Sequence, residues 1–224
     1  MLDGTVRIQA ECLKDFVAQV FGRLGVPWAD AQITAEVLVA ADLRGIESHG
    51  VQRLGRYVGR LKKGLIQPVA EVRLVRDRTA TLLLDGGNGL GQVVGSRAME
   101  LCVEKAKEAG AAFVVVRNSN HYGIAGYYAM LALRHDMVGL SFTNARPLVV
   151  PTYGREPLIG TNPISIAVPA GRERPFVLDM ATSVVPSGKI EMAARKGERI
   201  PLGWAVDKEG RPTQDPQAAL SGGS

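Results

Sequence analysis

Apolar residues recur at intervals of three and four along the first seventy positions, which is the spacing of one face of an α-helix. Three such stripes occupy residues 13–24, 30–45 and 51–61, and each is followed by glycine or proline. Glycine and proline commonly end helices. We therefore predict three helices and place a domain boundary near residue 70, so that residues 1–70 form a helical domain.

Beyond residue 70, short β-branched runs alternate with longer helical stretches. The predicted strands are 79–84, 111–116 and 137–143, and the predicted helices between them are 91–109 and 124–135. The run at 111–116 contains no charge, which favours a strand buried on both faces of a parallel sheet. The alternation predicts an α/β fold with a parallel or mixed sheet, and we assign residues 71–224 to one α/β domain.

A glycine-rich stretch at residues 85–91 joins a predicted strand to a predicted helix. Its glycines do not follow the G-x-G-x-x-G spacing of the dinucleotide fingerprint. The next strand also ends in Arg117, where that fingerprint would place an acidic partner for a ribose. We interpret the stretch as a tight turn.

Composition and charge limit the possible classes of protein. Of the 224 residues, 46% are apolar and 22% are charged, as in ordinary globular proteins. No apolar run approaches the ~20 residues that span a bilayer, so we expect no membrane association. The net charge of +5 leaves a basic nucleic-acid-binding module as an alternative. We expect no nucleic-acid partner, because acidic residues are interleaved with the basic ones and no binding signature occurs.

Cysteine usage and the amino terminus predict a cytoplasmic location. Cys12 and Cys102 each lie in an apolar helical pattern, where we expect small buried thiols and no disulfide. The first residues lack the basic-then-apolar order of a signal peptide.

The third predicted helix carries reactive side chains opposite its apolar stripe. At ~100° per residue, that side presents His49, Arg53, Arg56, Tyr57 and Arg60. Ser48 is a natural N-cap, and the positive end of the helix dipole would favour a neutral His49 that can exchange a proton. Arg53 could hold a carboxylate through two parallel bonds. The alternative is a solvated basic face.

A second histidine follows the predicted strand at 111–116. Five residues with hydrogen-bonding side chains precede Tyr122 and Gly123, and the last of the five is His121. Open α/β sheets bind ligands just beyond the carboxyl ends of their strands, so His121 is a candidate working residue. The alternative is a polar turn.

Three later clusters contain the donors and acceptors that suit a ribose, an amide or a phosphate, and we place each at a strand end. They are Asn144, then Thr161, Asn162 and Pro163, then Asp179, Met180, Ala181, Thr182 and Ser183, and Lys189 adds a charge at the start of a helical stretch. Each cluster alone is also ordinary turn chemistry. No spacing of histidines, thiols and carboxylates suggests a metal site.

Together these residues fit the transfer of a hydride between a nicotinamide and a 2-hydroxy or 2-oxo acid. That reaction needs a carboxylate anchor, a group that exchanges the hydroxyl proton and a polar pocket for the cofactor. Arg53, the two histidines and the three clusters can fill these roles.

Several long motifs also resemble the malate/L-lactate dehydrogenase family of the second, non-Rossmann type. They are residues 41–50 with Arg53 and Tyr57, residues 118–123, residues 160–163, and residues 179–183 with 188–190. The resemblance implies a homodimer with a helical substrate and dimerisation domain at 1–70. It also implies a non-Rossmann cofactor domain at 71–224 that binds NAD or NADP.

The resemblance further implies a role for each matching residue. Ser48, His49 and His121 are implied in proton transfer, and Arg53, Tyr57 and Thr161 in substrate binding. The implied cofactor contacts are His121, Tyr122, Gly123, Asn144, Asn162, Pro163, Asp179, Met180, Ala181, Thr182, Ser183 and Lys189. Which histidine moves the proton stays open.

Two features depart from the family pattern. The family usually continues beyond residue 224, so the cofactor domain is expected to be incomplete at its C-terminus, and a catalytically silent, nucleotide-binding or dimerising relative is an alternative. Arg146 and Pro186 stand where small residues are commoner. A guanidinium at 146 would alter substrate choice or favour a phosphorylated cofactor.

Overall fold

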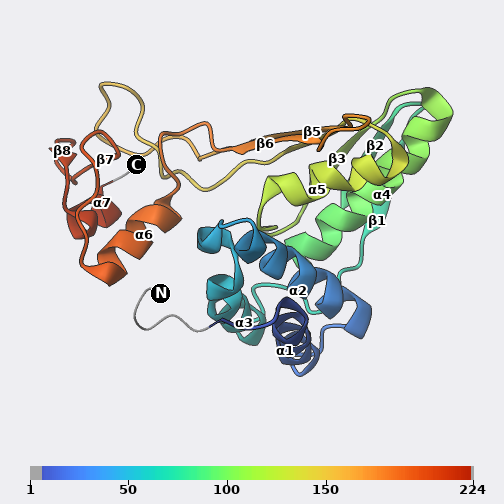
Figure 1. The fold of residues 1–224 in the computed structure, drawn as a ribbon, viewed down its shortest axis with the longest axis horizontal. Helices are drawn as coiled ribbons and strands as arrows, with labels where there is room; N and C mark the ends of the chain where they lie inside the picture. Colours follow the sequence, from blue (N-terminus) through green and yellow to red (C-terminus); the bar gives the residue numbers. More distant parts are fainter. Residues whose placement is uncertain (1–6, 223–224) are drawn as a thin grey trace.

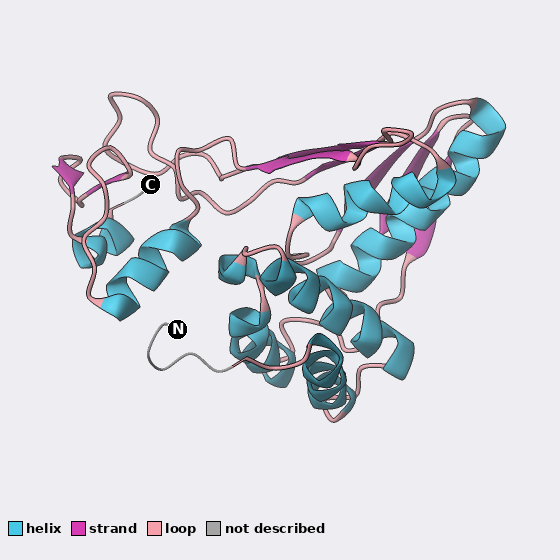
Figure 2. Cartoon of the chain, in the orientation of Figure 1, coloured by secondary structure: helices cyan, strands magenta, loops and turns pink. Residues whose placement is uncertain are grey.

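The computed structural model describes residues 7–222, and its first part is helical (Figures 1 and 2). Helices α1 and α2 pack against each other, and two short 3-10 turns lead into α3. Their bounds are Ala10–Gly22 for α1, Trp28–Leu43 for α2, Glu47–His49 and Val51–Arg53 for the turns η1 and η2, and Leu54–Lys62 for α3. The three predicted helices are therefore present.

The third helix starts later than predicted because Gly50 interrupts it. Gly50 has an extended backbone (φ −86°, ψ −154°), and a Cβ there would lie 1.7 Å from an Asp42 carboxylate oxygen. The same carboxylate accepts a hydrogen bond from the Val51 N–H at 2.9 Å. The prediction that Ser48 caps a helix beginning at His49 is wrong. The Asp42 carboxylate, and not the Ser48 hydroxyl, accepts the hydrogen bond from the backbone N–H at Val51.

The mixed sheet predicted after residue 70 is confirmed. Strands β1 (Arg73–Asp77), β2 (Thr81–Asp85) and β3 (Phe113–Arg117) lie in the order β1-β2-β3. The first pair is antiparallel and the second is parallel. Helix α4 makes the parallel crossover over Gly91–Ala109, with the bounds that the apolar spacing predicted.

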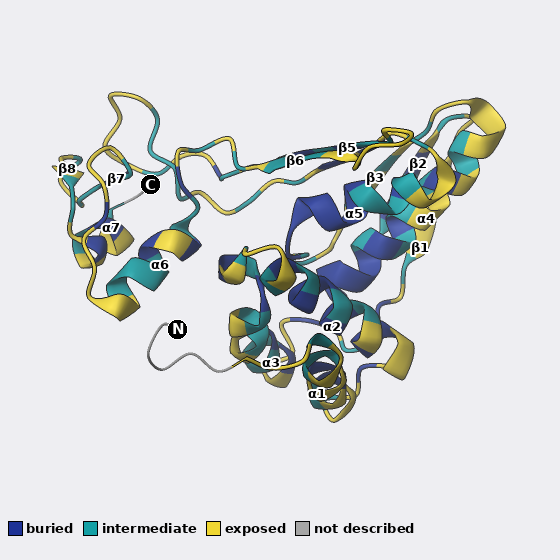
Figure 3. Cartoon of the chain, viewed as in Figure 1, coloured by how far each residue is buried: buried dark blue, intermediate teal, exposed yellow. Residues whose placement is uncertain are grey.

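Burial of β3 on both faces was wrongly predicted. Phe113 and Val115 are 55% and 47% exposed, whereas Val114 and Val116 on the other face are partly buried. Helix α4 packs against only one face of this sheet (Figure 3). An apolar run alone does not reveal that one face is left uncovered.

A second, antiparallel sheet follows α5 (Ala125–Leu131) and the turn η3 (Ala132–His135). It has the order β4-β5-β6, with β4 at Gly139–Phe142, β5 at Ile164–Val168 and β6 at Phe176–Met180. Phe142 pairs with Ile164, and Ile164 pairs with Met180. The segments after β4, before β5 and after β6 therefore meet at one edge of the sheet.

The chain ends in a small lobe with its own core. The lobe contains α6 (Ser187–Lys196), β7 (Ala205–Val206), β8 (Pro212–Thr213) and α7 (Pro216–Ser221). Its buried side chains include Val185, Ile190 and Ile200. Figure 1 shows the lobe beyond the second sheet, with α6 facing the helical part, and α6 contacts η1.

The largest core crosses the proposed domain boundary. Val17, Phe21 and Leu38 of the helical part share it with Leu90 and Val93 at the start of α4. The division at residue 70 stays a prediction, and the shared core holds the start of α4 firmly against the helical part.

Both cysteines are free, as expected, but Cys12 is exposed and Cys102 is only partly buried. The prediction of a buried thiol is therefore wrong for Cys12. Among the helices of residues 7–222, none has the length and apolarity needed to cross a membrane.

Candidate active site

The structure brings together two histidines that are 72 positions apart in the sequence. His49 ends the turn η1, and His121 lies in the loop between β3 and α5. Their ring centroids are 5.5 Å apart and their planes differ by 21°, so the rings stack. We call His49 and His121 the histidine pair.

The glycine-rich turn holds the His121 loop in place. A Cβ at Gly91 would lie 2.1 Å from the Asn120 carbonyl oxygen and 2.6 Å from that of His121. The Asn120 side-chain amide donates to the carbonyl oxygens of Asn88 and Gly89 at 3.1 and 2.9 Å. The tight turn predicted from the glycines thus positions a candidate catalytic loop, which its spacing did not signal.

Tyr57 fixes the orientation of the His121 ring. The phenol is 2% exposed, and its oxygen lies 2.6 Å from Nδ1 of His121. The Gly123 N–H also points at Nδ1, at 3.4 Å. A backbone N–H can only donate, so Nδ1 is an acceptor and the neutral ring carries its proton on Nε2. Tyr57 therefore holds the Nδ1 side of the His121 ring. A direct contact between Tyr57 and a substrate stays a prediction.

Ser48 and α6 support His49 on the other side of the site. Ser48 Oγ lies 2.9 Å from Nδ1 of His49, and Ser48 is 5% exposed. A Cβ at Gly188 of α6 would lie 2.9 Å from the Ser48 Cβ and 2.7 Å from an Arg53 nitrogen. Only a glycine allows α6 to approach Ser48 this closely.

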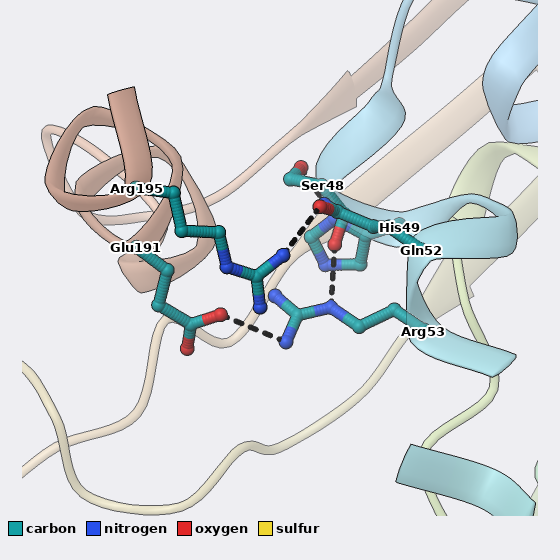
Figure 4. Close-up of polar contacts among 6 residues, drawn as sticks. All are labelled: Ser48, His49, Gln52, Arg53, Glu191 and Arg195. Carbon is teal, nitrogen blue, oxygen red and sulfur yellow. Dashed lines mark hydrogen bonds and ion pairs between the residues drawn. The ribbon is translucent and has the colours of Figure 1, made fainter. Parts of the chain in front are cut away.

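Arg53 joins the helical part to the terminal lobe (Figure 4). Its Nε donates to the Ser48 carbonyl oxygen at 2.6 Å, and Nη1 donates to Glu191 at 3.1 Å. A second contact, from Arg195 to Gln52 at 3.5 Å, lies beside it. Sequence reasoning missed Glu191 and Arg195, because no local pattern predicts which helix packs on Arg53.

Both histidines are neutral near pH 7. Burial, followed by the Arg53 guanidinium, lowers the pKa of His49 to about 4, although Glu191 opposes this. Desolvation by the surrounding protein, then His49, Arg56 and Arg53, lower the pKa of His121 to about 3. The neutral state expected for His49 is therefore present, but burial and guanidiniums cause it and no helix dipole is needed.

The basic face of α3 points into the site and is not simply solvated. Arg60 donates to the Asn120 side chain at 3.3 Å, next to His121. The pKa of Arg56 is lowered by burial and then by Arg53 and Arg146. Arg146, which departs from the family pattern, thus adds charge to the same cluster. This concentration of guanidiniums suits an anionic substrate.

The pKa values of the histidine pair predict a loss of stability in acid. The unfolded chain, with histidine pKa values near 6.5, binds more protons than the folded chain between about pH 6.5 and pH 3. The contribution of the histidine pair to the free energy of unfolding is therefore highest above pH 6.5 and should fall as the pH decreases toward 3. Denaturant titrations across this range should show a smaller decrease in the free energy of unfolding when both histidines are changed to glutamine. An equal decrease in the variant and the unaltered protein would contradict the burial of two neutral histidines.

The predicted cofactor clusters meet at one edge of the second sheet. Asn162 accepts a hydrogen bond from the Ala145 N–H at 3.0 Å, and the Thr182 N–H donates to the Thr161 carbonyl oxygen at 2.9 Å. Asn144 is exposed beside them. Antiparallel pairing explains the meeting, because it brings the segment before β5 next to the segments after β4 and β6. Thr161 to Pro163 lie at a strand end, as predicted, and that end is the start of β5.

We predicted that Asp179 and Met180 lie in a loop after a strand. The structure instead places both residues within β6. The strand continues because both residues still pair with β5. The Asp179 carboxylate accepts from the Gly126 N–H at the start of α5, at 2.6 Å. A cofactor contact from Asp179 stays a prediction, and its observed bond favours a role in orienting α5.

The remaining predicted cofactor residues border the same region. The Tyr122 hydroxyl is 3.2 Å from Ser141 Oγ, and Ser183 Oγ donates to the Val185 carbonyl oxygen. Lys189 is exposed next to Gly188. The amides, hydroxyls and ammonium group of this edge are the donors that a dinucleotide needs, so the residues present fit a nicotinamide cofactor. Within residues 7–222, no three His, Cys, Asp or Glu side chains gather as a metal site.

Comparisons with known proteins found similar sequences and structures. The family profile described as malate/L-lactate dehydrogenase matches residues 8–224. The malate dehydrogenase of Pyrococcus horikoshii is 51% identical over 222 residues, which cover 99% of this chain and 61% of that protein. The L-sulfolactate dehydrogenase of Methanocaldococcus jannaschii is 48% identical, with 96% and 62% covered.

Solved structures show the same likeness. The crystal structure of malate dehydrogenase from Entamoeba histolytica superposes with a TM-score of 0.93 at 42% identity, covering 96% of this chain and 60% of that one. The chain therefore spans about three fifths of the length of the relatives it matches.

Proposed function

The chain belongs to the malate/L-lactate dehydrogenase family, and from that premise we propose an NAD(P)-dependent oxidoreductase that acts on a small 2-hydroxy or 2-oxo acid. The observation that carries the proposal is the neutral, stacked histidine pair beside Arg53 and Arg56. The relatives named malate and sulfolactate dehydrogenase make four-carbon dicarboxylates and sulfonated acids the first substrates to test.

The guanidiniums would hold the acid and set the protonation of the histidine pair. In the free site, burial and then the nearby guanidiniums lower both pKa values, so the rings are neutral. A bound carboxylate offsets that positive charge and raises the pKa of an adjacent imidazole. Substrate binding would therefore add one proton to the histidine pair. It would not add two, because two imidazolium rings with centroids 5.5 Å apart would repel each other.

During reduction, the protonated ring would give its Nε2 proton to the substrate oxygen and become neutral again. A bound nicotinamide supplies the hydride in that direction and accepts it in the other. The Nδ1 atoms of the pair face Tyr57 and Ser48, so Nε2 of either ring is the atom available for transfer. The residues that would hold the cofactor are Asn144, Asn162, Lys189 and their neighbours at the edge of the second sheet.

The choice between NAD and NADP is part of the proposal. A relative from Chromohalobacter salexigens, 38% identical, is named (2R)-3-sulfolactate dehydrogenase (NADP(+)). We propose that Arg146 favours the phosphorylated cofactor, and that the protein forms a homodimer. Light scattering during size-exclusion chromatography tests the dimer.

The function is tested by following the absorbance of NADH and NADPH with a panel of 2-oxo acids that includes oxaloacetate and sulfopyruvate. Oxidation that depends on one of these acids would support the proposal. Cofactor binding without turnover would instead support a catalytically silent relative. A protein that neither binds nor oxidises either cofactor would contradict both.

Arg53→Lys is expected to raise the Michaelis constant for the oxo acid by about tenfold or more. A lysine cannot reproduce the planar, multiple hydrogen bonds of a guanidinium, which are worth about 1.5 to 3 kcal/mol when a charged partner is involved. Steady-state kinetics check this, with Arg76→Lys on exposed β1 as the matched control. An unchanged Michaelis constant would remove Arg53 as the carboxylate anchor.

A further inference from the structure

Glu191 places a carboxylate on the guanidinium that we expect to hold the substrate. It lies within α6, and its Oε2 accepts a hydrogen bond from Nη1 of Arg53 at 3.1 Å. The side chains of Arg53 and Glu191 are 13% and 28% exposed. The ion pair is therefore partly shielded from water, and it joins two segments that lie far apart in the sequence.

Both two-donor faces of the Arg53 guanidinium are already engaged. A guanidinium can grip a carboxylate through Nε with one terminal nitrogen, or through its two terminal nitrogens. Here Nε donates to the Ser48 carbonyl oxygen at 2.6 Å, and Nη1 donates to Glu191. Beside Nη2, α6 packs so closely that a Cβ at Gly188 would lie 2.7 Å from it. A substrate carboxylate can therefore take two parallel bonds from the terminal nitrogens only after Glu191 leaves.

We propose that Glu191 is an internal carboxylate that occupies the substrate anchor in the free site, is displaced by the acid, and so sets the affinity of the site. Its carboxylate has the same charge and shape as the group that replaces it. The negative charge of Glu191 also raises the pKa of His49, against burial and Arg53, as a bound carboxylate would. The inference rests on the proposed function, because Arg53 anchors a substrate carboxylate only if the protein acts on an acid.

Displacement of Glu191 would also loosen the terminal lobe. The core cluster of the lobe is built from residues 185–219, and α6 meets the helical part at η1. The contact between Arg195 and Gln52, beside the ion pair in Figure 4, is 3.5 Å long and therefore weak. Loss of the ion pair should thus speed the backbone hydrogen exchange of α6.

The test is the binding of oxalate to the whole chain, measured by calorimetry without cofactor. Oxalate is a small dicarboxylate that resembles a 2-oxo acid and is not reduced by hydride. Glu191→Gln keeps the shape of the side chain and removes its charge, so the amide competes poorly for Arg53. We expect this variant to bind oxalate about three to ten times more tightly than the unaltered protein.

Two controls assign the change to the ion pair. Glu198→Gln removes a charge from an exposed position of the same lobe and should leave the oxalate affinity unchanged. In a chain that carries Arg53→Met, adding Glu191→Gln should have little effect, because the two carboxylates no longer compete for a guanidinium at position 53. Glu191→Ala replaces Glu191→Gln if the latter fails to fold.

Backbone hydrogen exchange, followed by mass spectrometry, reports on the lobe. In the unaltered protein, oxalate should speed the exchange of residues 187–196. In Glu191→Gln, the same residues should exchange rapidly before oxalate is added, and oxalate should change their exchange little. Unchanged or slower exchange when oxalate binds to the unaltered protein would contradict the displacement of Glu191.

Equal or weaker oxalate binding by Glu191→Gln, or no binding by either protein, would overturn the proposal. The ion pair would then only tie the lobe to the helical part. The measurements need neither cofactor nor turnover. A protein that oxidises no nicotinamide could still show the displacement, and an active dehydrogenase could fail to show it, so failure of the proposed function and failure of this inference are distinguishable.

Discussion

Changing either member of the histidine pair to glutamine is expected to lower kcat/KM for oxo-acid reduction by about 10²- to 10⁴-fold. Glutamine keeps a polar side chain of similar reach but cannot carry a transferable proton, and a positioned acid or base contributes about that factor. The measurement is the initial rate of NADH or NADPH oxidation at subsaturating oxo acid.

The double variant and a remote histidine serve as controls. If His49 and His121 share one proton, His49→Gln and His121→Gln together should be little worse than the more damaging single change. His135→Gln, on the exposed turn η3, should leave the rate unchanged. A full rate in either single variant would remove that histidine from proton transfer.

Gly91→Ala is expected to combine a loss of stability with a loss of activity. Its Cβ would lie 2.1 Å from the Asn120 carbonyl oxygen, and a backbone atom cannot swing aside as a flexible side chain can. Overpacking of this kind costs about 1 to 3 kcal/mol. Moving the His121 loop by about 1 Å would lower kcat by about 100-fold.

Chemical denaturation and kinetics of Gly91→Ala check both effects. The matched control is Gly55→Ala on α3, where nothing lies within 4 Å of the added methyl. That change should stabilise the protein by about 0.5 to 1 kcal/mol, because alanine favours a helix over glycine. If Gly91→Ala is as active and stable as the control, the glycine does not hold the His121 loop.

The parts of the fold that depend on local spacing were predictable. The period of apolar residues gave the bounds of α4, and the strand-helix alternation gave the mixed sheet. The residues of the histidine pair could also be selected, because each combined a titratable ring with polar neighbours near the end of an element. Their proximity was an expectation that only the fold could test.

Features that depend on contacts between distant segments were not predictable. Asp42 replaces Ser48 as the acceptor at the start of the third helix, since the chain turns back at Gly50. Glu191 reaches Arg53 across 138 positions. The exposed face of β3 likewise depends on where α4 packs, which the apolar run at 111–116 does not encode.

A crystal structure of the protein with a nicotinamide dinucleotide and a 2-oxo-acid analogue that cannot be reduced would test the proposed site most directly. We expect the oxo oxygen of the analogue to lie within about 3.2 Å of Nε2 of His49 or His121, with its carboxylate on the guanidiniums of α3 and the preceding turn. An analogue bound elsewhere, with both imidazoles in contact only with protein, would contradict proton transfer by the histidine pair.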